Sequence, residues 1–360
     1  MDVHDKGDIA VGAYEDQMNR ALRPVAPPKV LQGVYTDDQH ARLLEVVRQK
    51  GPWPTIQSHH FKTVDELIAT VTGVVPEGHG LTLDDIAGPL FRGFLGQNSV
   101  CFHPEIHDCF YNQGFLDLVK DYWGAQYAKP TMMLFNLAMP QPELAPQPPH
   151  LDAVTFRGVR YENAPVWLQN VMAKSGLFTN YIVKMAQVIT WWYLGENGTF
   201  TYWPDGPLGE PAVLEHPLWN KGVVVQNELM FHRGDPVGPF HGPGIDVKHR
   251  SLMGWDDDAQ LWRVTTDGET IGTFDQSQLR FLVHWNAELY EDMGELKKVM
   301  DHTDDLSIEE AIGTLLADMR AKGRTVPEPS DPLNDTDFIR ALVETYTIAP
   351  TTEWLEIPAA

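Results

Sequence analysis

Two residues that can bind a metal stand close together in the stretch "PPHLDAVTFRG", residues 148–158. His150 and Asp152 are two positions apart, directly after a pair of prolines and at the start of an apolar run. The prolines favour extended backbone, and the run is typical of a strand that begins there. Because side chains i and i+2 of a strand project from one face, the imidazole and the carboxylate would point the same way. The pair alone is also common on protein surfaces, so a metal site needs a third ligand.

His232 is the candidate third ligand. It follows the apolar segment "KGVVVQ" and a turn at Gln226-Asn227-Glu228. Two histidines and one carboxylate form the ligand set of non-haem Fe(II) sites, which leaves three coordination positions open. A zinc site with one open position uses similar ligands, so the residue types leave the two metals as alternatives.

The segment "CFHPEIHDC" is a second group of potential metal ligands, namely Cys101, His103, His107 and Cys109. Its spacing is not one of the common zinc spacings. Pro104 within it fits the first turn of a helix. We therefore expect a helix start there, with zinc as the weaker alternative. Elsewhere in the chain, the adjacent residues His59 and His60 are expected to lie in a solvent-facing loop.

The elements that must position these residues follow from local sequence patterns. Helices are expected at 36–51, 63–73 and 104–124, from their caps and from Pro and Gly at their ends. After residue 130 the chain becomes a series of β-branched and aromatic runs, including a hairpin turn at Asp267-Gly268. We predict an extended arm over 1–30 and a single domain over 31–360. This domain would have helices over 36–125, a β-barrel core over 130–290 and C-terminal helices over 291–348.

Composition excludes several classes of partner. The formal net charge of −23 makes a nucleic-acid partner or an anionic membrane surface unfavourable, because phosphates would be repelled. No apolar run is long enough to span a bilayer, and the N-terminal residues lack the pattern of a signal peptide. Two cysteines in 360 residues fit a reducing compartment. The sequence therefore predicts a cytoplasmic protein with a small-molecule substrate.

Three segments in order resemble one known family. The order "PPHLDAVTF", "MAQVITWWYLGENGTFTYWPDGP" and "GVVVQNELMFHRGDP" is similar to the phytanoyl-CoA dioxygenase-like branch of the Fe(II)/2-oxoglutarate oxygenases. The resemblance runs from about Pro104 to Tyr290, and Val223 stands where the family usually has Asp. It implies a mainly β fold with flanking helices, whose core is a double-stranded β-helix, a jelly-roll barrel of the cupin type.

The resemblance also implies an activity. Fe(II) would be held by His150, Asp152 and His232, with 2-oxoglutarate and O2 as cosubstrates. Oxidative decarboxylation of 2-oxoglutarate to succinate would be coupled to oxidation of a C–H bond in a small or mid-sized metabolite. Hydroxylation is favoured over halogenation, because halogenating relatives have a small residue in place of Asp152. The alternative is a cupin-like metal protein that acts as a non-oxidative hydrolase or isomerase, or as a binding module.

The far carboxylate of 2-oxoglutarate requires a fixed cation, and a bidentate arginine suits it. The family places this arginine at the start of the strand after the distal histidine. Arg280, in "RFLVHWNAELY", has the better strand context, and Arg250, in "KHRSLMGW", is the second candidate. The alternation of that strand predicts that Arg280, Leu282 and His284 share one face, with Phe281, Val283 and Trp285 on the other.

Residues that contact the substrate are harder to predict. The segment between the H-x-D motif and the next long strand carries Arg157 and Arg160, which could meet an anionic group or could be surface cations. Trp191 would line a pocket if it lies beside the metal, although a core position is equally typical of tryptophan.

Overall fold

The computed structural model of the protein describes residues 11–71, 78–141, 148–239, 241–242 and 244–350. Within them the helices are α1 (Val11–Ala21), α2 (Asp37–Lys50), α3 (Gln57–His60), α4 (Val64–Val71), α5 (His107–Phe110), α6 (Gln113–Trp123), α7 (Val166–Ser175), α8 (Met293–Asp301), α9 (Ile308–Ala321) and α10 (Thr336–Thr345). No helix of this part of the chain is long and apolar enough to cross a membrane.

The strands form three antiparallel sheets. The large sheet has the order β1 (Lys29–Gln32), β9 (Leu218–Val225), β6 (Lys184–Tyr193), β14 (Arg280–Tyr290), β5 (Tyr127–Ala138), β3 (Leu90–Gln97) and β4 (Val100–Cys101). The small sheet has the order β10 (His232–Gly234), β7 (Phe200–Tyr202) and β8 (Ala212–Leu214). A peripheral sheet has the order β13 (Glu269–Phe274), β12 (Leu261–Thr266), β11 (Leu252–Asp256) and β2 (Trp53–Pro54).

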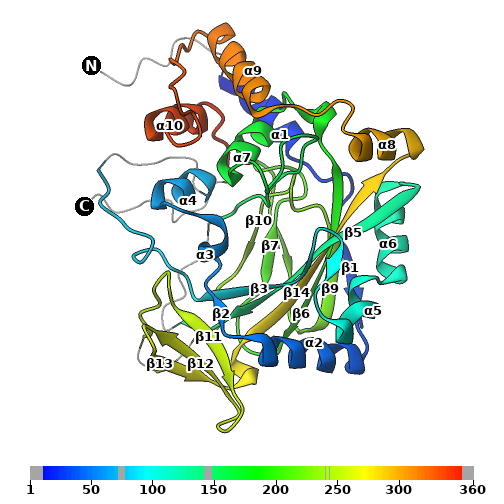
Figure 1. Ribbon diagram of the computed structural model, residues 1–360, viewed down its shortest axis with the longest axis vertical. Coiled ribbons are helices and arrows are strands. Elements are labelled where there is room, and N and C mark those ends of the chain that lie inside the picture. The colour runs from blue at the N-terminus through cyan, green and yellow to red at the C-terminus, as the bar shows by residue number, and fades with distance from the viewer. Residues whose placement is uncertain (1–10, 72–77, 142–147, 240, 243, 351–360) are drawn as a thin grey trace.

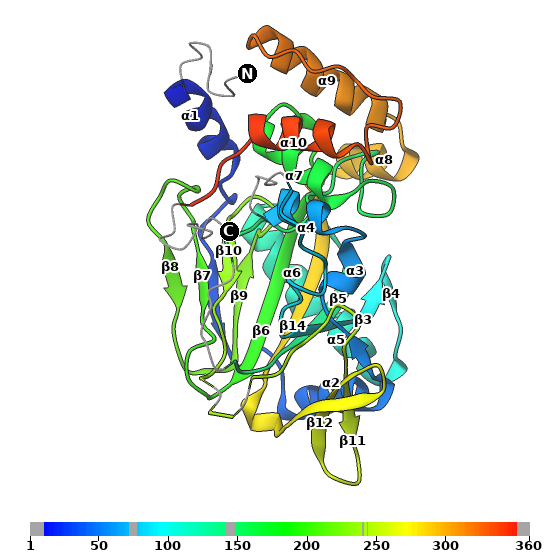
Figure 2. The same ribbon diagram turned by 90° about the vertical axis from the view of Figure 1, so that its left-hand side faces the viewer.

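The path of the chain between the large and small sheets defines the fold. From β5 in the large sheet it passes to a single bridge, His150 to His232, beside the small sheet. It then returns to β6, crosses to β7 and β8, returns to β9, crosses to β10, and ends in β14. Figure 2 shows the small sheet beside the large one. This regular alternation is a double-stranded β-helix, so the predicted fold class, mainly β with flanking helices, is confirmed.

The alternation along β14 separates the outside of the barrel from its inside. Phe281, Val283 and Trp285 belong to a hydrophobic core beneath helices α2 and α6. Leu282 belongs to a different cluster inside the barrel, and His284 faces the small sheet. The two faces predicted from the sequence are therefore confirmed. The inner face is the one that meets the candidate ligands.

Helices close one end of the barrel, and the peripheral sheet lies at the other (Figure 1). Helix α7 is buried along its whole length, and it packs against α1, α4, α9 and α10. Helix α2 starts at the predicted Thr36 cap, whose side chain accepts from the Gln39 backbone while the Gln39 side chain bonds back. Asp267 and Gly268 both have positive φ and form the predicted turn between β12 and β13.

Four expectations about elements are wrong. The arm over 1–30 contains helix α1, whose Met18 packs with Leu22 in the core of the helical end. The region 36–125 is not purely helical, because it also supplies β2, β3 and β4. The helix over 104–124 is broken into a 3-10 turn, α5 and α6, because Asn112 caps a new helix. The strand over 148–158 consists of isolated bridges at His150 and Phe156.

Candidate metal centre

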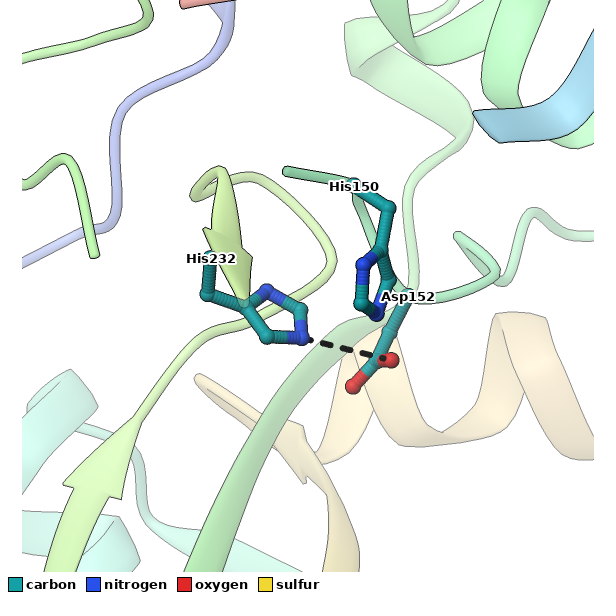
Figure 3. Close-up of side chains that lie close together, drawn as sticks. All are labelled: His150, Asp152 and His232. Carbon is teal, nitrogen blue, oxygen red and sulfur yellow. Dashed lines mark ion pairs between the residues drawn. The ribbon is translucent and has the colours of Figure 1, made fainter. Parts of the chain in front are cut away.

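The three predicted ligands lie together between the two sheets. One ligand atom from each of His150, Asp152 and His232 lies within 4.8 Å of the others, as Figure 3 shows. The His232 Nε2 atom is 3.7 Å from Asp152 Oδ1. Backbone contacts fix this arrangement: the His150 N–H donates to His232 O at 2.9 Å, and the His232 N–H donates to His150 O at 3.0 Å. The Asp152 N–H donates to the Asn227 carbonyl at 3.2 Å.

Both histidines present Nε2 to the site. The Nδ1 atom of His150 lies 3.2 Å from the Pro148 carbonyl, and that of His232 lies 3.0 Å from the Met230 carbonyl. A carbonyl oxygen only accepts, so Nδ1 carries the proton in each ring and Nε2 keeps its lone pair. Metal-binding histidines are oriented in this way by their second nitrogen. The two rings are therefore held in the form that a metal requires.

The charge states also suit a cation. Burial, followed by the charge of His232, lowers the pKa of His150 to about 4, so this ring is neutral near pH 7. Burial alone would raise the pKa of Asp152, but nearby cationic groups outweigh it and lower the pKa to about 2. Asp152 Oδ2 is buried and has no hydrogen-bond partner within the described residues. A buried carboxylate oxygen without a partner is costly, and a bound cation would remove that cost. The residues fit a divalent metal.

Arg280 lies at the start of β14, on the inner face of the barrel. Its Nη1 donates to the carbonyls of Gly198 at 2.6 Å, Asp235 at 3.0 Å and Thr199 at 3.2 Å, while its buried Nε has no hydrogen-bond partner among the described residues. It borders a pocket of about 260 Å³ that Pro148 also lines. A Cβ at Gly234 would lie 2.8 Å from Arg280 Nη2. Because Gly234 is two residues beyond His232, the guanidinium lies about 7 Å along β10 from that ligand.

The second arginine candidate, Arg250, is not brought to the barrel. It is half-exposed beside the peripheral sheet, where it forms ion pairs with Asp84 and Asp267. The sequence alone could not decide between Arg250 and Arg280 as the anchor of 2-oxoglutarate. Residue types do not show how long the insertion after β10 is, and therefore which segment forms the next strand of the barrel. The ion pairs with Asp84 and Asp267 indicate that Arg250 has a structural role.

The three suggested substrate residues have structural contacts. Arg157 is buried and forms a two-point ion pair with Asp304, at 2.8 and 3.1 Å. Arg160 Nη1 donates to Glu288 at 2.9 Å. Both cations are therefore already neutralised by a carboxylate. Trp191 lies inside the barrel, almost fully buried, with its ring 5.2 Å from that of Phe200. It forms part of the barrel packing.

Sequence reasoning missed several polar residues around the ligands. His284 Nε2 is 4.0 Å from Asp152 Oδ2 and has no hydrogen-bond partner within the described residues. Glu228, expected in a turn, is buried, and one of its oxygens accepts from Gln187 Nε2. Burial, followed by the charge of Asp152, raises the pKa of Glu228 to about 8. The alternation along β14 could have shown that His284 lies on the inner face of the barrel. Nothing in the sequence of the turn indicated that Glu228 is buried.

Arg92 and His60 were also missed. Arg92, on β3, donates from Nε to Asn136 at 2.8 Å and contacts His60 Nε2 through Nη1 at 2.7 Å. The expectation that His59 and His60 face solvent is wrong, because His59 Nε2 also bonds to the Arg92 carbonyl at 3.0 Å. The Cys101 and Cys109 thiols are buried and free. The His150, Asp152 and His232 group is the one cluster of potential metal ligands found in the described chain.

Comparisons with known proteins give a general likeness. No family model matches the sequence, and no curated protein matches it. A 2OG-Fe(II) oxygenase family oxidoreductase from Burkholderia pseudomallei is 10% identical with a TM-score of 0.37, over 79% of this chain and 94% of that one. A Trichoplax adhaerens prolyl hydroxylase is 8% identical with a TM-score of 0.36, over 79% and 94%.

A third similar structure is HygX from Streptomyces hygroscopicus, with nickel, 2-oxoglutarate and hygromycin B bound. It is 10% identical with a TM-score of 0.34, over 74% of this chain and 86% of that one. None of these three structures is named as a phytanoyl-CoA dioxygenase. The fold assignment rests on the strand order of the protein itself.

Proposed function

We propose that the protein is a non-haem Fe(II)/2-oxoglutarate-dependent dioxygenase that hydroxylates, or otherwise oxidises at a C–H bond, a small or mid-sized metabolite. The observation that carries this proposal is the ligand set: one ligand atom from each of His150, Asp152 and His232 lies within 4.8 Å of the others inside a double-stranded β-helix, and the buried Asp152 Oδ2 has no hydrogen-bond partner among the described residues. This ligand set leaves open positions on Fe(II) for a cosubstrate and O2. The phytanoyl-CoA dioxygenase-like branch remains the finer assignment, supported by the order of the sequence motifs.

The proposed overall reaction balances as substrate R–H, 2-oxoglutarate and O2 giving R–OH, succinate and CO2. Bound Fe(II) would supply the redox chemistry with O2. His150, Asp152 and His232 would hold the metal, and the backbone bonds between His150 and His232 would keep their rings in place. Arg280 would bind the far carboxylate of 2-oxoglutarate through the side of its guanidinium that Nη1 does not use. Asp152 would bind the metal as a carboxylate ligand, which favours hydroxylation over halogenation.

Succinate formation by purified protein supplied with Fe(II), 2-oxoglutarate and O2 tests the proposal. The wild type should form succinate slowly even without a prime substrate. His232→Ala should abolish succinate formation, and Asp152→Gly should both weaken Fe(II) binding and abolish it. His107→Ala is the matched control, because that ring is exposed and distant in sequence from the ligands. Succinate formation that survives His232→Ala would overturn the assignment of His232 as a metal ligand, and no succinate formation by the wild type would favour a non-oxidative cupin-like protein.

A further inference from the structure

Arg92 is a cation beside the metal centre that the proposed reaction does not use. Its Nε and Nη1 atoms bond to the neutral side chains of Asn136 and His60, and its Nη2 atom makes no hydrogen bond within the described residues. No carboxylate of the described chain forms an ion pair with it. Burial lowers its pKa to about 10, so the guanidinium stays charged near pH 7.

The strand register places Arg92 close to the proposed metal ligands. Asn136 on β5 stands between Arg92 on β3 and Leu282 on β14. His284 is two residues further along the inner face of β14, and it lies 4.0 Å from Asp152. The Cα atoms of Arg92 and His284 are two strand spacings apart across the sheet and two residues apart along the strand direction. Together these separations amount to roughly 12 Å. The bond from Arg92 Nε to Asn136 directs the arginine side chain across β5 and into this interval.

A chain of hydrogen bonds holds the guanidinium in a fixed orientation. Arg92 Nη1 donates to His60 Nε2, His60 Nδ1 donates to the Tyr161 hydroxyl oxygen at 3.2 Å, and Tyr161 donates to the His59 carbonyl at 2.7 Å. Each group in this chain has a suitable donor or acceptor while His60 is neutral. Burial, followed by the charge of Arg92, lowers the pKa of His60 well below its usual value. The guanidinium is thus held in one orientation, with Nη2 left without a hydrogen bond among the described residues.

This side of the site is also accessible. Arg92, His60 and Tyr161 are half-buried, and the Asp152 side chain keeps 30% of its surface exposed. Arg280 is nearly fully buried, with 5% of its surface exposed. We therefore assign the buried Arg280 to the cosubstrate, which is the same in every turnover. The half-buried Arg92 is better placed to bind a substrate that enters from solvent. In a chain with a net charge of −23, a cation next to the site that forms no ion pair with a carboxylate of the described residues favours an anionic ligand.

We infer that Arg92 is a specificity-determining residue that binds the carboxylate of an organic acid substrate. The inference rests on the proposed function, because it takes Arg280 as the anchor of 2-oxoglutarate. The Nη2 atom of Arg92 and the second N–H of its Nη1 can together donate to the two oxygens of a carboxylate. A phosphate monoester, with almost two negative charges, would require a further cation in so acidic a protein. The acid group would bind at Arg92, and the carbon chain would extend toward Asp152 and His232.

Binding of hexanoate, compared with its neutral analogue hexanamide, tests the inference. The protein is loaded with Mn(II) and saturating 2-oxoglutarate, so that Arg280 is occupied and O2 chemistry is absent. Paramagnetic relaxation of the ligand protons then reports both affinity and proximity to the metal. We expect saturable hexanoate binding near the metal, with hexanamide at least tenfold weaker. Arg92→Gln should weaken hexanoate binding at least tenfold, to the level of hexanamide, without changing the binding of hexanamide.

Three further variants make the result specific. Arg250→Gln removes an equal charge from the periphery and should leave hexanoate binding within twofold of the wild type. Arg92→Lys keeps the charge without the fork, so it should fold and retain part of the affinity. Arg280→Gln should weaken 2-oxoglutarate binding. Hexanoate binding that Arg92→Gln leaves unchanged, or equal binding of hexanamide by the wild type, would overturn the inference. So would an Arg92→Gln variant that loses affinity for 2-oxoglutarate instead of hexanoate.

Failure of the proposed function gives a different result. In that case the wild type does not bind 2-oxoglutarate in the presence of Mn(II). Saturation-transfer NMR then measures hexanoate binding to metal-free protein, without a contribution from the metal. The Arg280→Gln variant is measured in parallel to test whether hexanoate binds at Arg280 instead. Loss of this signal in Arg92→Gln alone supports the carboxylate site, and loss in Arg280→Gln alone overturns it.

Discussion

At the scale of single residues, the half-buried Arg92 and the buried Arg280 have contrasting surroundings that make their roles testable. Arg280 donates through one nitrogen to three carbonyls and has a buried Nε with no partner. Arg92 is held by two neutral side chains and lies toward the accessible side. Neither cation is neutralised by a bonded carboxylate among the described residues, so each can receive an anion.

Arg280→Ala should raise the apparent 2-oxoglutarate requirement at least a hundredfold, with Fe(II) binding nearly unchanged. A buried charge that loses its partner costs roughly 3–5 kcal/mol, which corresponds to a factor of this size or larger. The measurement is the rate of succinate formation as a function of 2-oxoglutarate concentration. Arg250→Ala, which removes an exposed ion-paired arginine, serves as the control and should change the requirement little. The opposite pattern would move the anchor to Arg250.

Glu228 should make stability depend on pH. Its pKa is raised from 4.5 to about 8 in the folded protein, first by burial and then by Asp152. Between these values the folded state holds a proton that the unfolded state has lost, so the free energy of unfolding falls as pH rises from 4.5 to 8. Glu228→Gln cannot lose that proton. We expect the variant and wild type to be equally stable at pH 5, and the variant to be more stable by about 2 kcal/mol at pH 8.5.

Urea unfolding of metal-free protein at the two pH values checks this prediction. The comparison removes contributions from other titrating groups, because they are common to both proteins. A difference in unfolding free energy that is the same at pH 5 and pH 8.5 would contradict a raised pKa at Glu228.

At the scale of elements, Gly158 joins the segment after Asp152 to the connection between α8 and α9. Its φ is +85°, and a Cβ there would lie 2.2 Å from the Leu306 carbonyl oxygen. The adjacent Arg157 carbonyl accepts from the Leu306 N–H at 3.0 Å, and Arg157 forms an ion pair with Asp304. This contact between two connections fixes the chain that leads out of the metal centre.

Gly158→Ala should therefore lower the free energy of unfolding by about 3 kcal/mol or more, because strain from positive φ adds to a clash with backbone. Gly124→Ala is the matched control. Gly124 also has positive φ, at the C-terminal cap of α6, but a Cβ there meets nothing within 4 Å. That variant should lose only about 1 kcal/mol. Chemical unfolding of both proteins measures the difference, and equal losses would rule out the clash.

The elements also show what the sequence can and cannot predict. Helix α2, the β12–β13 hairpin and the two faces of β14 follow from caps, turn residues and alternation, which act over a few residues. The candidate ligands were predicted because three motifs occur in the order that the resembled family shows. Arg92 was missed because its role depends on β3 pairing with β5, which brings it to Asn136, 44 residues away in the chain. His150 holds its position through one bridge to His232, which local pattern cannot distinguish from a strand.

At the scale of the whole molecule, the net charge of −23 should make stability depend on salt. Self-repulsion of a strongly charged chain disfavours the compact state, and salt screens it. We expect the unfolding temperature of metal-free protein to rise by several degrees between about 10 mM and about 500 mM NaCl. Choline chloride at the same ionic strengths should have the same effect, since it screens equally. A flat or falling unfolding temperature would show that ion pairs outweigh the net repulsion.

The central position of β14 has a consequence for how the protein is made. This strand is the last of the barrel in the chain, yet it lies between β5 and β6 and pairs with both along almost its whole length. During synthesis, β5 and β6 emerge from the ribosome long before the strand that joins them, and each has an unpaired edge until residue 290 has been added. Unpaired edges are templates for aggregation. The nascent protein therefore exposes two strand edges for a long interval, in which aggregation competes with folding.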